Sequence, residues 1–357
     1  MNVIIESWQL TTPGAAFTHV EAPAPALADG EALVEVAGCG VCHTDMSFWH
    51  HGVQTRHALP LTLGHEISGV VVDGPSELVG RSVIVPAVLP CGECDLCRAG
   101  RSNVCRNQKM PGNDFNGGFA THVVVPARFL CPVPDRLLER IPLATLSVVA
   151  DAVSTPYQAV RKSGLVEGDF AIVIGVGGVG TYGALIARLL GATVLALDID
   201  DAKLAAVAAQ GVDATLNIAG VDPKTVKERV REIARALDAP PHAWKIFEFS
   251  GTKAGQELAF SLVTYASTLS IVGFTLEKVE LRLSNLMAFD AQVIGTWGCR
   301  PELYPEVVAL LDEGRLDVVP FVETFPLSEI NEVFANTLAH RYMKRSVLVP
   351  GAHANQS

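Results

Sequence analysis

The stretch FAIVIGVGGVGTYGALIARLLGATVLALD, residues 170–198, decides the fold of the second half of the chain. After Phe170, the apolar run Ala171–Ile174 predicts a strand and leads into a glycine-rich turn. Apolar residues then recur at helical spacing over Val179–Leu190, and a second apolar run follows at Thr193–Leu197. Strand, turn, helix and strand in this order predict a βαβ unit of a parallel sheet.

The same alternation continues beyond this unit. Helices are predicted over Ala202–Gln210 and Lys224–Leu237, and a further strand over Lys245–Phe249. We therefore expect an α/β fold with a doubly wound parallel sheet of the Rossmann type.

The turn itself has the GxGxxG pattern that binds dinucleotides. Glycines allow a tight turn, close approach of a pyrophosphate and close packing of helix on strand. The helix N-terminus offers N–H groups and a partial positive charge to the phosphates. The expected cofactor contacts are Gly175, Gly177, Gly178, Val179 and Gly180.

An acid follows at the spacing expected for ribose binding. Asp198 ends the second strand, 18 residues after Gly180, where about 20 is usual. A carboxylate there accepts hydrogen bonds from two ribose hydroxyls and repels a 2′-phosphate, so NAD is favoured over NADP. Asp200 and Asp201 add to that repulsion. The alternative is a glycine turn without a ligand and a solvated aspartate.

The first third of the chain has a different character. Short β-type runs at Ala32–Val36, Gly69–Val72, Ser82–Val85 and Thr121–Val125 are separated by Gly and Pro, which predicts an irregular, mainly β domain. Strand-like runs at Val318–Val322 and Ser346–Val349 suggest that the chain returns to this domain. We expect one domain of residues 1–152 with 297–357, and a second of 153–296.

A cluster of cysteines is the most specific metal signal. Four thiolates within 15 residues can close a tetrahedral structural zinc site and clamp a polar loop. An iron–sulfur cluster is the competing interpretation. The four residues are Cys91, Cys94, Cys97 and Cys105.

A second metal site is suggested by Cys42 and by Gly64-His65-Glu66. A thiolate, an imidazole and one further ligand would make a three-ligand zinc site with an open fourth position. From spacing alone this is ambiguous, because Cys42 could be a buried thiol and His65 a structural histidine.

Composition limits the partners. The chain has 357 residues, is 49% hydrophobic and carries a net charge of −11, so neither nucleic acid nor an anionic membrane is expected to bind. Phe170–Ala187 lacks charge over 18 residues, but its five glycines favour strand, turn and helix over a membrane span. Clustered cysteines without a signal peptide suggest a cytoplasmic location.

Taken in order, these motifs resemble the zinc-containing medium-chain alcohol dehydrogenases over nearly the whole chain. The resemblance implies a GroES-like catalytic domain that holds a catalytic and a structural zinc, and a Rossmann NAD-binding domain. It implies that Cys42 and His65 are ligands of the catalytic zinc. Thr44 would take the substrate proton, Asp45 would orient His65, and Glu66 would lie behind the metal.

The same resemblance implies further cofactor contacts. His43 and Arg345 match positions that face the pyrophosphate, and Lys203 matches a position near the adenosine ribose. Thr155 is expected beside the nicotinamide.

The sequence departs from the family pattern at the third zinc ligand. Many relatives have a cysteine, and others a glutamate, where this chain has Asp151. A carboxylate can ligate zinc, and an unpaired buried aspartate would be costly. We predict that Asp151 is the third ligand, with Glu66 swinging in as the alternative. A second departure is Ser47, where relatives often have a histidine that relays protons; His50, His51 or His57 could serve instead.

The resemblance implies oxidation of an alcohol by hydride transfer to NAD⁺. The overall sequence, with Asp151, is most similar to 6-hydroxycyclohex-1-ene-1-carbonyl-CoA dehydrogenases of anaerobic benzoyl-CoA degradation, which implies an acyl-CoA thioester substrate. Arg56, Arg300 and Lys344 are basic candidates for contacts with the CoA tail.

Three alternatives stay open. The substrate could be a simple alcohol or polyol. The chain could be a non-catalytic NAD-binding relative, although Cys42, His65 and Thr44 are all present, or a metal-free reductase, although those lack the cysteine lobe. The family usually forms dimers or tetramers, so a homo-oligomer is expected.

Overall fold

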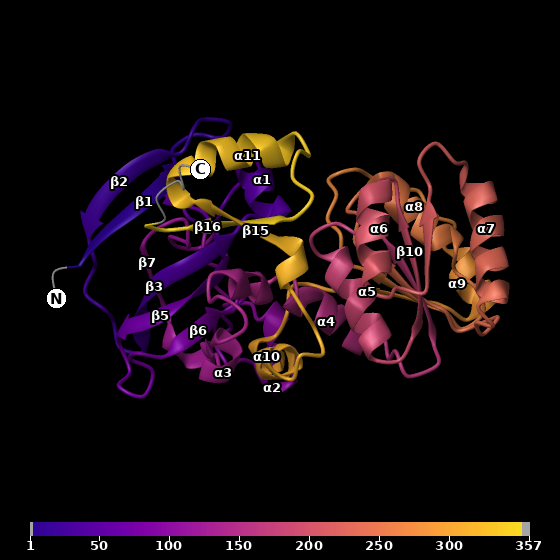
Figure 1. Ribbon diagram of the computed structural model, residues 1–357, viewed down its shortest axis with the longest axis horizontal. Coiled ribbons are helices and arrows are strands. Elements are labelled where there is room, and N and C mark those ends of the chain that lie inside the picture. Colours follow the sequence, from indigo (N-terminus) through magenta and orange to yellow (C-terminus); the bar gives the residue numbers. More distant parts are fainter. Residues whose placement is uncertain (1–2, 352–357) are drawn as a thin grey trace. The chain divides into compact units, whose positions relative to one another are not determined.

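The computed structural model describes residues 3–351 of the chain. Contacts divide the chain into two compact units, one of residues up to Ser154 and from Gly298 on, the other Thr155–Trp297 (Figure 1). The domain boundaries expected from the sequence lie within two residues of these. The ends of the expected first domain, residues 1–2 and 352–357, lie outside the described residues.

The second unit is built on one parallel sheet in the order β11-β10-β9-β12-β13-β14. Its strands are β9 (Phe170–Ile174), β10 (Thr193–Asp198), β11 (Ala214–Asn217), β12 (Lys245–Glu248), β13 (Thr268–Ile271) and β14 (Gln292–Gly295). Its helices are α4 (Ser154–Lys162, which begins in the first unit), α5 (Gly180–Leu189), α6 (Asp201–Ala209), α7 (Pro223–Ala236), α8 (Lys253–Ser261) and α9 (Ser284–Phe289).

The order of this sheet reverses at its centre. The chain runs from β9 outward to β11 and then returns to β12 on the opposite side of β9. In doubly wound sheets, ligands bind at the carboxyl ends of the strands at such a reversal. The glycine-rich turn begins where β9 ends, and the predicted Rossmann-type sheet is confirmed.

The spacing of apolar residues in the strands and helices determines which side chains form the core of this unit. Phe170, Ile172 and Ile174 point to one face of β9 and pack with Val226 and Val230 of α7. Those two valines lie four residues apart and therefore share one side of the helix. Helices α5 and α6 cover the other face (Figure 1).

The first unit is mainly β, as predicted. One sheet has the order β2-β1-β4, and a seven-stranded sheet has the order β15-β16-β3-β5-β6-β8, with β7 paired to β3. The strands are β1 (Ile4–Leu10), β2 (Thr18–Pro23), β3 (Glu31–Gly40), β4 (Leu61–Thr62), β5 (Glu66–Asp73), β6 (Ser82–Val85), β7 (His122–Pro126), β8 (Cys131–Pro132), β15 (Val322–Pro326) and β16 (Arg345–Val349).

Short helices connect these strands. They are α1 (His43–Trp49), α2 (Asp95–Arg98), α3 (Asp135–Leu138), α10 (Tyr304–Asp312) and α11 (Ile330–Leu338). The 3₁₀ turns are η1 (Ser102–Val104), η2 (Ala127–Phe129), η3 (Thr145–Ala150), η4 (Pro301–Leu303), η5 (Val319–Phe321) and η6 (Leu327–Glu329). Aromatic side chains close the core of the unit: Phe17, Phe119 and Phe334 pack edge to face at centroid distances of 4.6–6.4 Å.

One strand prediction is wrong. The run Val318–Val322 is not a strand along its length, because Val319–Phe321 forms the 3₁₀ turn η5 and β15 begins only at Val322. Pro320 lies inside that turn, and a proline has no N–H to donate to a sheet. The apolar composition was therefore misleading there.

The uncharged stretch around the glycine turn is not a membrane span. In the described part of the chain, no helix is long and apolar enough to cross a bilayer. Helix α5, which this stretch enters, is 10 residues long.

Two candidate metal centres and a dinucleotide site

Strand register brings Cys42 and His65 together. Strand β3 ends at Gly40 and β5 begins at Glu66, and these two residues are paired antiparallel. Cys42 follows the end of β3 by two residues, and His65 immediately precedes β5. These two side chains, 23 positions apart in sequence, thus lie at the same end of two neighbouring strands.

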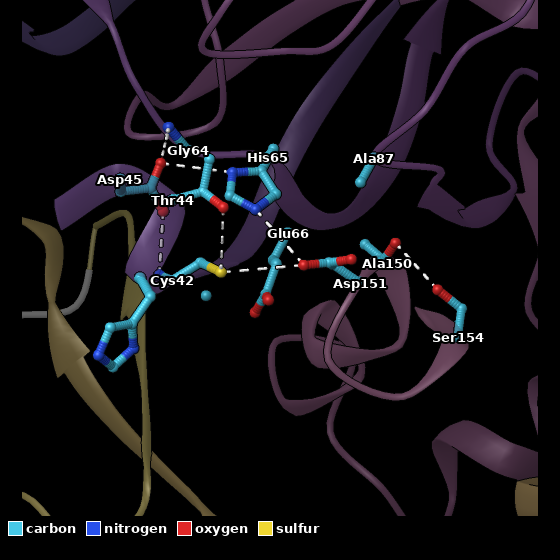
Figure 2. Close-up of polar contacts among 12 residues, drawn as sticks. Cys42, Thr44, Asp45, Gly64, His65, Glu66, Ala87, Ala150, Asp151 and Ser154 are labelled. Carbon is cyan, nitrogen blue, oxygen red and sulfur yellow. Dashed lines mark hydrogen bonds and ion pairs between the residues drawn. The ribbon is translucent and has the colours of Figure 1, made fainter. Parts of the chain in front are cut away.

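Asp45 holds both ligand loops from α1. Its Oδ2 accepts the N–H of Cys42 at 3.0 Å, and its Oδ1 accepts the N–H of Gly64 at 3.2 Å. Oδ1 also lies 3.4 Å from Nδ1 of His65 (Figure 2). Asp45 is fully buried, and these donors offset the cost of burying its carboxylate. With Nδ1 facing Asp45, Nε2 of His65 is turned toward the remaining ligands.

Asp151 completes a triangle with Cys42 and His65. Its Oδ2 lies 3.8 Å from Sγ of Cys42 and 3.7 Å from Nε2 of His65 (Figure 2). Tetrahedral zinc with ordinary bond lengths requires ligand separations of about 3.3–3.7 Å. The three donors therefore fit a zinc ion with little movement.

Glu66 is near the same group but has another partner. Its carboxylate lies within 4.8 Å of the other three ligand atoms. It is fully buried, and it pairs with the guanidinium of Arg345, whose Nε donates at 3.1 Å and whose Nη2 makes a second contact. Arg345 begins β16, which pairs with β3 at Cys39 and Gly40.

The electrostatics of this centre are those of a site for a cation. Burial alone would lower the pKa of His65, but the charge of Asp45 and hydrogen bonds to Asp151 and Cys42 raise it well above its usual value. Burial raises the pKa of Glu66, while Arg345 opposes that rise. The acidic side chains thus favour positive charge at the point where a metal would bind.

The four-cysteine group has the dimensions of a zinc–thiolate tetrahedron. The Sγ–Sγ distances are 3.5 Å for Cys94–Cys97 and Cys91–Cys105, 3.7 Å for Cys94–Cys105 and 4.0 Å for Cys91–Cys97. A Zn–S bond of about 2.3 Å implies about 3.8 Å between sulfurs. The four thiols therefore fit a single zinc ion.

The thiols of this lobe do not share one protonation state. Backbone N–H groups of Glu93 and Cys94 lower the pKa of Cys91 to about 6. Burial and the Cys94 thiol raise the pKa of Cys97 to about 12. Packing four sulfurs this closely disfavours four thiolates unless a cation neutralises them.

The glycine turn leaves room for a ligand at one position. A Cβ built on Gly180 would lie 1.8 Å from the carbonyl oxygen of Gly175, so the turn itself requires glycine there. A Cβ on Gly177 would meet nothing within 4 Å, and Gly177 has no positive φ. The chain's own packing does not account for glycine at 177, whereas close approach of a pyrophosphate does.

Asp198 is joined to this turn. Its Oδ2 accepts the N–H of Val176 at 2.8 Å, and its Oδ1 accepts the N–H groups of Ile199 at 2.8 Å and Asp200 at 3.1 Å. Lys203 lies in the first turn of α6, where Asp200 is the N-cap. The acid, the lysine and the glycines thus gather at the carboxyl ends of β9 and β10.

The remaining predicted residues lie on the helices that follow these ligands. Thr44 is half-buried on α1, with its hydroxyl 3.9 Å from Sγ of Cys42, and His43 is exposed beside it. Thr155 is buried near the start of α4. Ser47 donates a hydrogen bond to the carbonyl of His43 at 2.9 Å.

Residues around Asp151 were not predicted from the sequence. The carbonyl of Ala150 accepts hydrogen bonds from Ser154 Oγ at 3.2 Å (Figure 2) and from the hydroxyl of Tyr304. Tyr304 also accepts the N–H of Ala87 at 3.3 Å. A tyrosine 153 positions from Asp151 carries no motif that would have revealed this contact.

Comparisons with known proteins agree with this geometry. Residues 28–135 match the alcohol dehydrogenase GroES-like domain, and residues 178–313 match the zinc-binding dehydrogenase family. An alcohol dehydrogenase of Geobacillus stearothermophilus is 32% identical over 88% of this chain and 90% of its own length.

Solved structures of similar fold extend the comparison. The alcohol dehydrogenase of the archaeon Aeropyrum pernix superposes with a TM-score of 0.85 at 26% identity, over 97% of this chain and 100% of that one. A zinc-binding dehydrogenase from Sinorhizobium meliloti, solved with NADP bound, has a TM-score of 0.85 at 24% identity, over 98% and 100%.

Proposed function

Since the chain belongs to the family of zinc-binding medium-chain alcohol dehydrogenases, we propose that it oxidises an alcohol to a ketone with NAD⁺ as hydride acceptor. It is an NAD(P)-dependent zinc alcohol dehydrogenase with a GroES-like domain and a Rossmann-type sheet. The observation that carries the finer proposal is the convergence of Cys42, His65 and Asp151.

We assign the catalytic zinc to these three residues and the structural zinc to the four-cysteine lobe. Three protein ligands would leave a bound zinc accessible to substrate, whereas the four thiolates would enclose it. When bound, zinc supplies Lewis-acid polarisation of the alcohol, and NAD⁺ accepts the hydride.

The chain's own residues orient the reaction and move the proton. Thr44 offers a hydroxyl beside Cys42 that can accept the substrate proton. Asp45 fixes the ring of His65 through its contact with Nδ1. Onward transfer needs an acceptor near α1. Ser47 is already bonded to the carbonyl of His43, whereas His50 and His51 are exposed at the end of the helix.

The cofactor is assigned to the second unit. A pyrophosphate can bind at the N-terminus of the helix that begins at Gly180, where Gly177 leaves space for it. The carboxylate of Asp198 can accept a hydrogen bond from a ribose with a free 2′-hydroxyl. We propose NAD rather than NADP on this ground. Lys203 would lie near the ribose and Thr155 near the nicotinamide. His43 and Arg345 would face the pyrophosphate; Arg345 uses only part of its five N–H donors on Glu66.

For the substrate we propose a cyclic allylic alcohol carried as a CoA thioester, namely 6-hydroxycyclohex-1-ene-1-carbonyl-CoA. A hollow of about 360 Å³ lies near the far end of α1, lined by Leu10, Phe48 and residues 52–59, which include Arg56. Its lining combines apolar side chains with the polar side chains of residues 54–57. Arg56 also pairs with Asp114 at 3.3 Å, so a CoA phosphate would have to share it. A secondary alcohol or polyol without CoA is the second candidate.

The test is to compare the CoA thioester with its free acid and with cyclohexenol, following NADH formation by absorbance. Turnover of the thioester alone supports the CoA proposal. Better turnover of the small alcohol contradicts it and favours a general alcohol dehydrogenase. If none is oxidised while the zinc and NAD contents are normal, both substrate proposals are wrong.

A further inference from the structure

The peptide between Ala150 and Asp151 is a point where the fold can control the metal site. A peptide group is planar, so fixing the carbonyl oxygen of Ala150 also fixes the nitrogen and Cα of Asp151. The side chain of Asp151 has only two further torsions between that Cα and the oxygen that faces Cys42 and His65. Small rotations of this peptide would therefore displace Oδ2 from the other two ligand atoms.

Three donors converge on that carbonyl. Ser154 Oγ lies at 3.2 Å, the N–H of Ala87 at 3.4 Å, and the hydroxyl of Tyr304 makes the shortest contact. The N–H of Ala87 is shared with the oxygen of Tyr304 at 3.3 Å. Ala87, Ala150 and Tyr304 are at most 5% exposed, so water does not compete for these bonds.

The side chain of Tyr304 is held in place by its burial and by its position at the start of α10. Its full burial also raises the pKa of its phenol, so it keeps its proton and donates. The segment just before it is tied to the cysteine lobe: Glu302 accepts from Ser102 Oγ at 2.7 Å, and Arg300 donates to the carbonyl of Gly100 at 3.0 Å. The segment that leads to Tyr304 thus has anchors besides the contact with Ala150.

We propose that Tyr304 is a positioning residue for the catalytic metal: its hydroxyl holds the Ala150–Asp151 peptide and thereby sets Asp151 Oδ2 in place as a ligand. This inference rests on the proposed role of Asp151. It also gives the buried tyrosine a function that packing alone does not need, because phenylalanine would fill the same space without the hydroxyl.

The experiment is a cobalt titration of Tyr304→Phe, with the metal-free protein refilled against a competing chelator. The visible spectrum distinguishes the two centres, since one thiolate gives weaker sulfur-to-cobalt absorption than four. We expect the affinity of the catalytic centre to fall on the order of tenfold, with shifted ligand-field bands and an unchanged lobe. Ser154→Ala, which removes another donor to the same carbonyl, should act in the same direction and serves if Tyr304→Phe does not fold.

Tyr342→Phe is the matched control. Its hydroxyl accepts from Asn336 at 3.0 Å in the same unit, and it should leave both cobalt spectra unchanged. Wild-type affinity and spectrum in a folded Tyr304→Phe would overturn the inference, and if that variant does not fold, the same result in Ser154→Ala would overturn it. Asp151→Ala tests the ligand assignment separately from the positioning role of Tyr304. If Asp151→Ala still binds cobalt normally, the ligand assignment fails together with the inference. If it loses cobalt while the Tyr304 and Ser154 variants do not, only the positioning role fails.

Discussion

At the candidate sites, the effect of replacing a single residue depends on whether the fold or the proposed ligand requires that residue. The proposed ligand set Cys42, His65 and Asp151 would keep the net charge of a set with two cysteines and a histidine, but would exchange a soft sulfur for a hard oxygen. In the glycine-rich turn, a Cβ on Gly180 would overlap the Gly175 carbonyl, whereas a Cβ on Gly177 would meet nothing within 4 Å, and we propose that Gly177 contacts the cofactor. We therefore expect a substitution at Gly180 to affect stability and a substitution at Gly177 to affect cofactor binding.

This difference predicts opposite results for two alanine substitutions. Gly180→Ala should destabilise the protein by about 1–3 kcal/mol or more, because its Cβ would overlap the Gly175 carbonyl. Gly177→Ala should leave the melting temperature close to wild type and weaken NADH binding about 10- to 100-fold, because the added Cβ would keep the pyrophosphate away from the backbone N–H groups. Thermal unfolding and NADH fluorescence titration measure both. Equal loss of stability in the two variants would contradict the assignment of Gly177 to the ligand.

Asp198 gives a second prediction at this scale. Asp198→Ser removes the negative charge expected to repel a 2′-phosphate, so kcat/KM for NAD should fall and that for NADP should rise. Asp213→Asn is the control, because Asp213 also accepts a backbone N–H, from Val194 at 2.8 Å, on the same sheet. The comparison of kcat/KM for both cofactors is decisive: an unchanged ratio in Asp198→Ser means that this carboxylate does not select NAD.

Among the elements, α10 connects the metal site to the periphery of the first unit. Tyr304 stands at its start and Asp312 at its end. Asp312 is nearly buried and accepts hydrogen bonds from Arg136 of α3, with Nε at 2.7 and 2.8 Å. Both ends of the helix are thus held by polar contacts as well as by its apolar face.

The Asp312 contact predicts a pH dependence. Hydrogen bonds from Arg136 hold the pKa of Asp312 below its usual 3.8, so the folded state prefers the ionised form. The stabilisation is therefore present above the unfolded pKa and is lost as pH falls through the folded value. Asp312→Asn should lower the melting temperature at pH 7, and the difference from wild type should shrink below about pH 4. A difference that stays constant down to pH 2 would show that the effect is not electrostatic.

At the scale of the whole molecule, chemistry is divided between two units with separate cores. The first holds both candidate metal centres, and the second holds the candidate dinucleotide site. The sheet of the second unit has β14 as an edge strand, and several exposed apolar residues lie between the end of β13 and the start of β14 or on β14 itself. They are Phe274, Leu276, Leu283, Met287 and Val293, which are 40–79% exposed. An apolar edge of this kind is costly in water unless another surface covers it.

We therefore expect the protein to be a homo-oligomer that uses this edge. Met287→Glu places a charge in the apolar group and should shift the protein toward monomers in light scattering after gel filtration. Val166→Glu, at a residue 62% exposed but outside this group, is the control and should not change the mass. A monomeric wild-type protein would rule out the oligomer.

The local patterns were sufficient for much of this architecture. Periodicity and the glycine turn predicted the parallel sheet, because side-chain spacing follows directly from strand and helix geometry. The cysteine spacing predicted that four thiols come together, because all four cysteines lie within one short segment. The run Val318–Val322 was misassigned, because its composition is that of a strand while Pro320 breaks the pattern.

The sequence by itself therefore determined the family, the fold of both units and the residue types at each site. The βαβ unit and the four-cysteine group are encoded in residues close along the chain, and the family and its GroES-like domain followed from the order of the motifs over the whole chain. Only the tertiary structure decided that Glu66 pairs with Arg345, 279 positions away, and that Tyr304 bonds the carbonyl of Ala150, 154 positions away. Such contacts depend on strand register and helix packing, which bring together side chains that no local pattern connects.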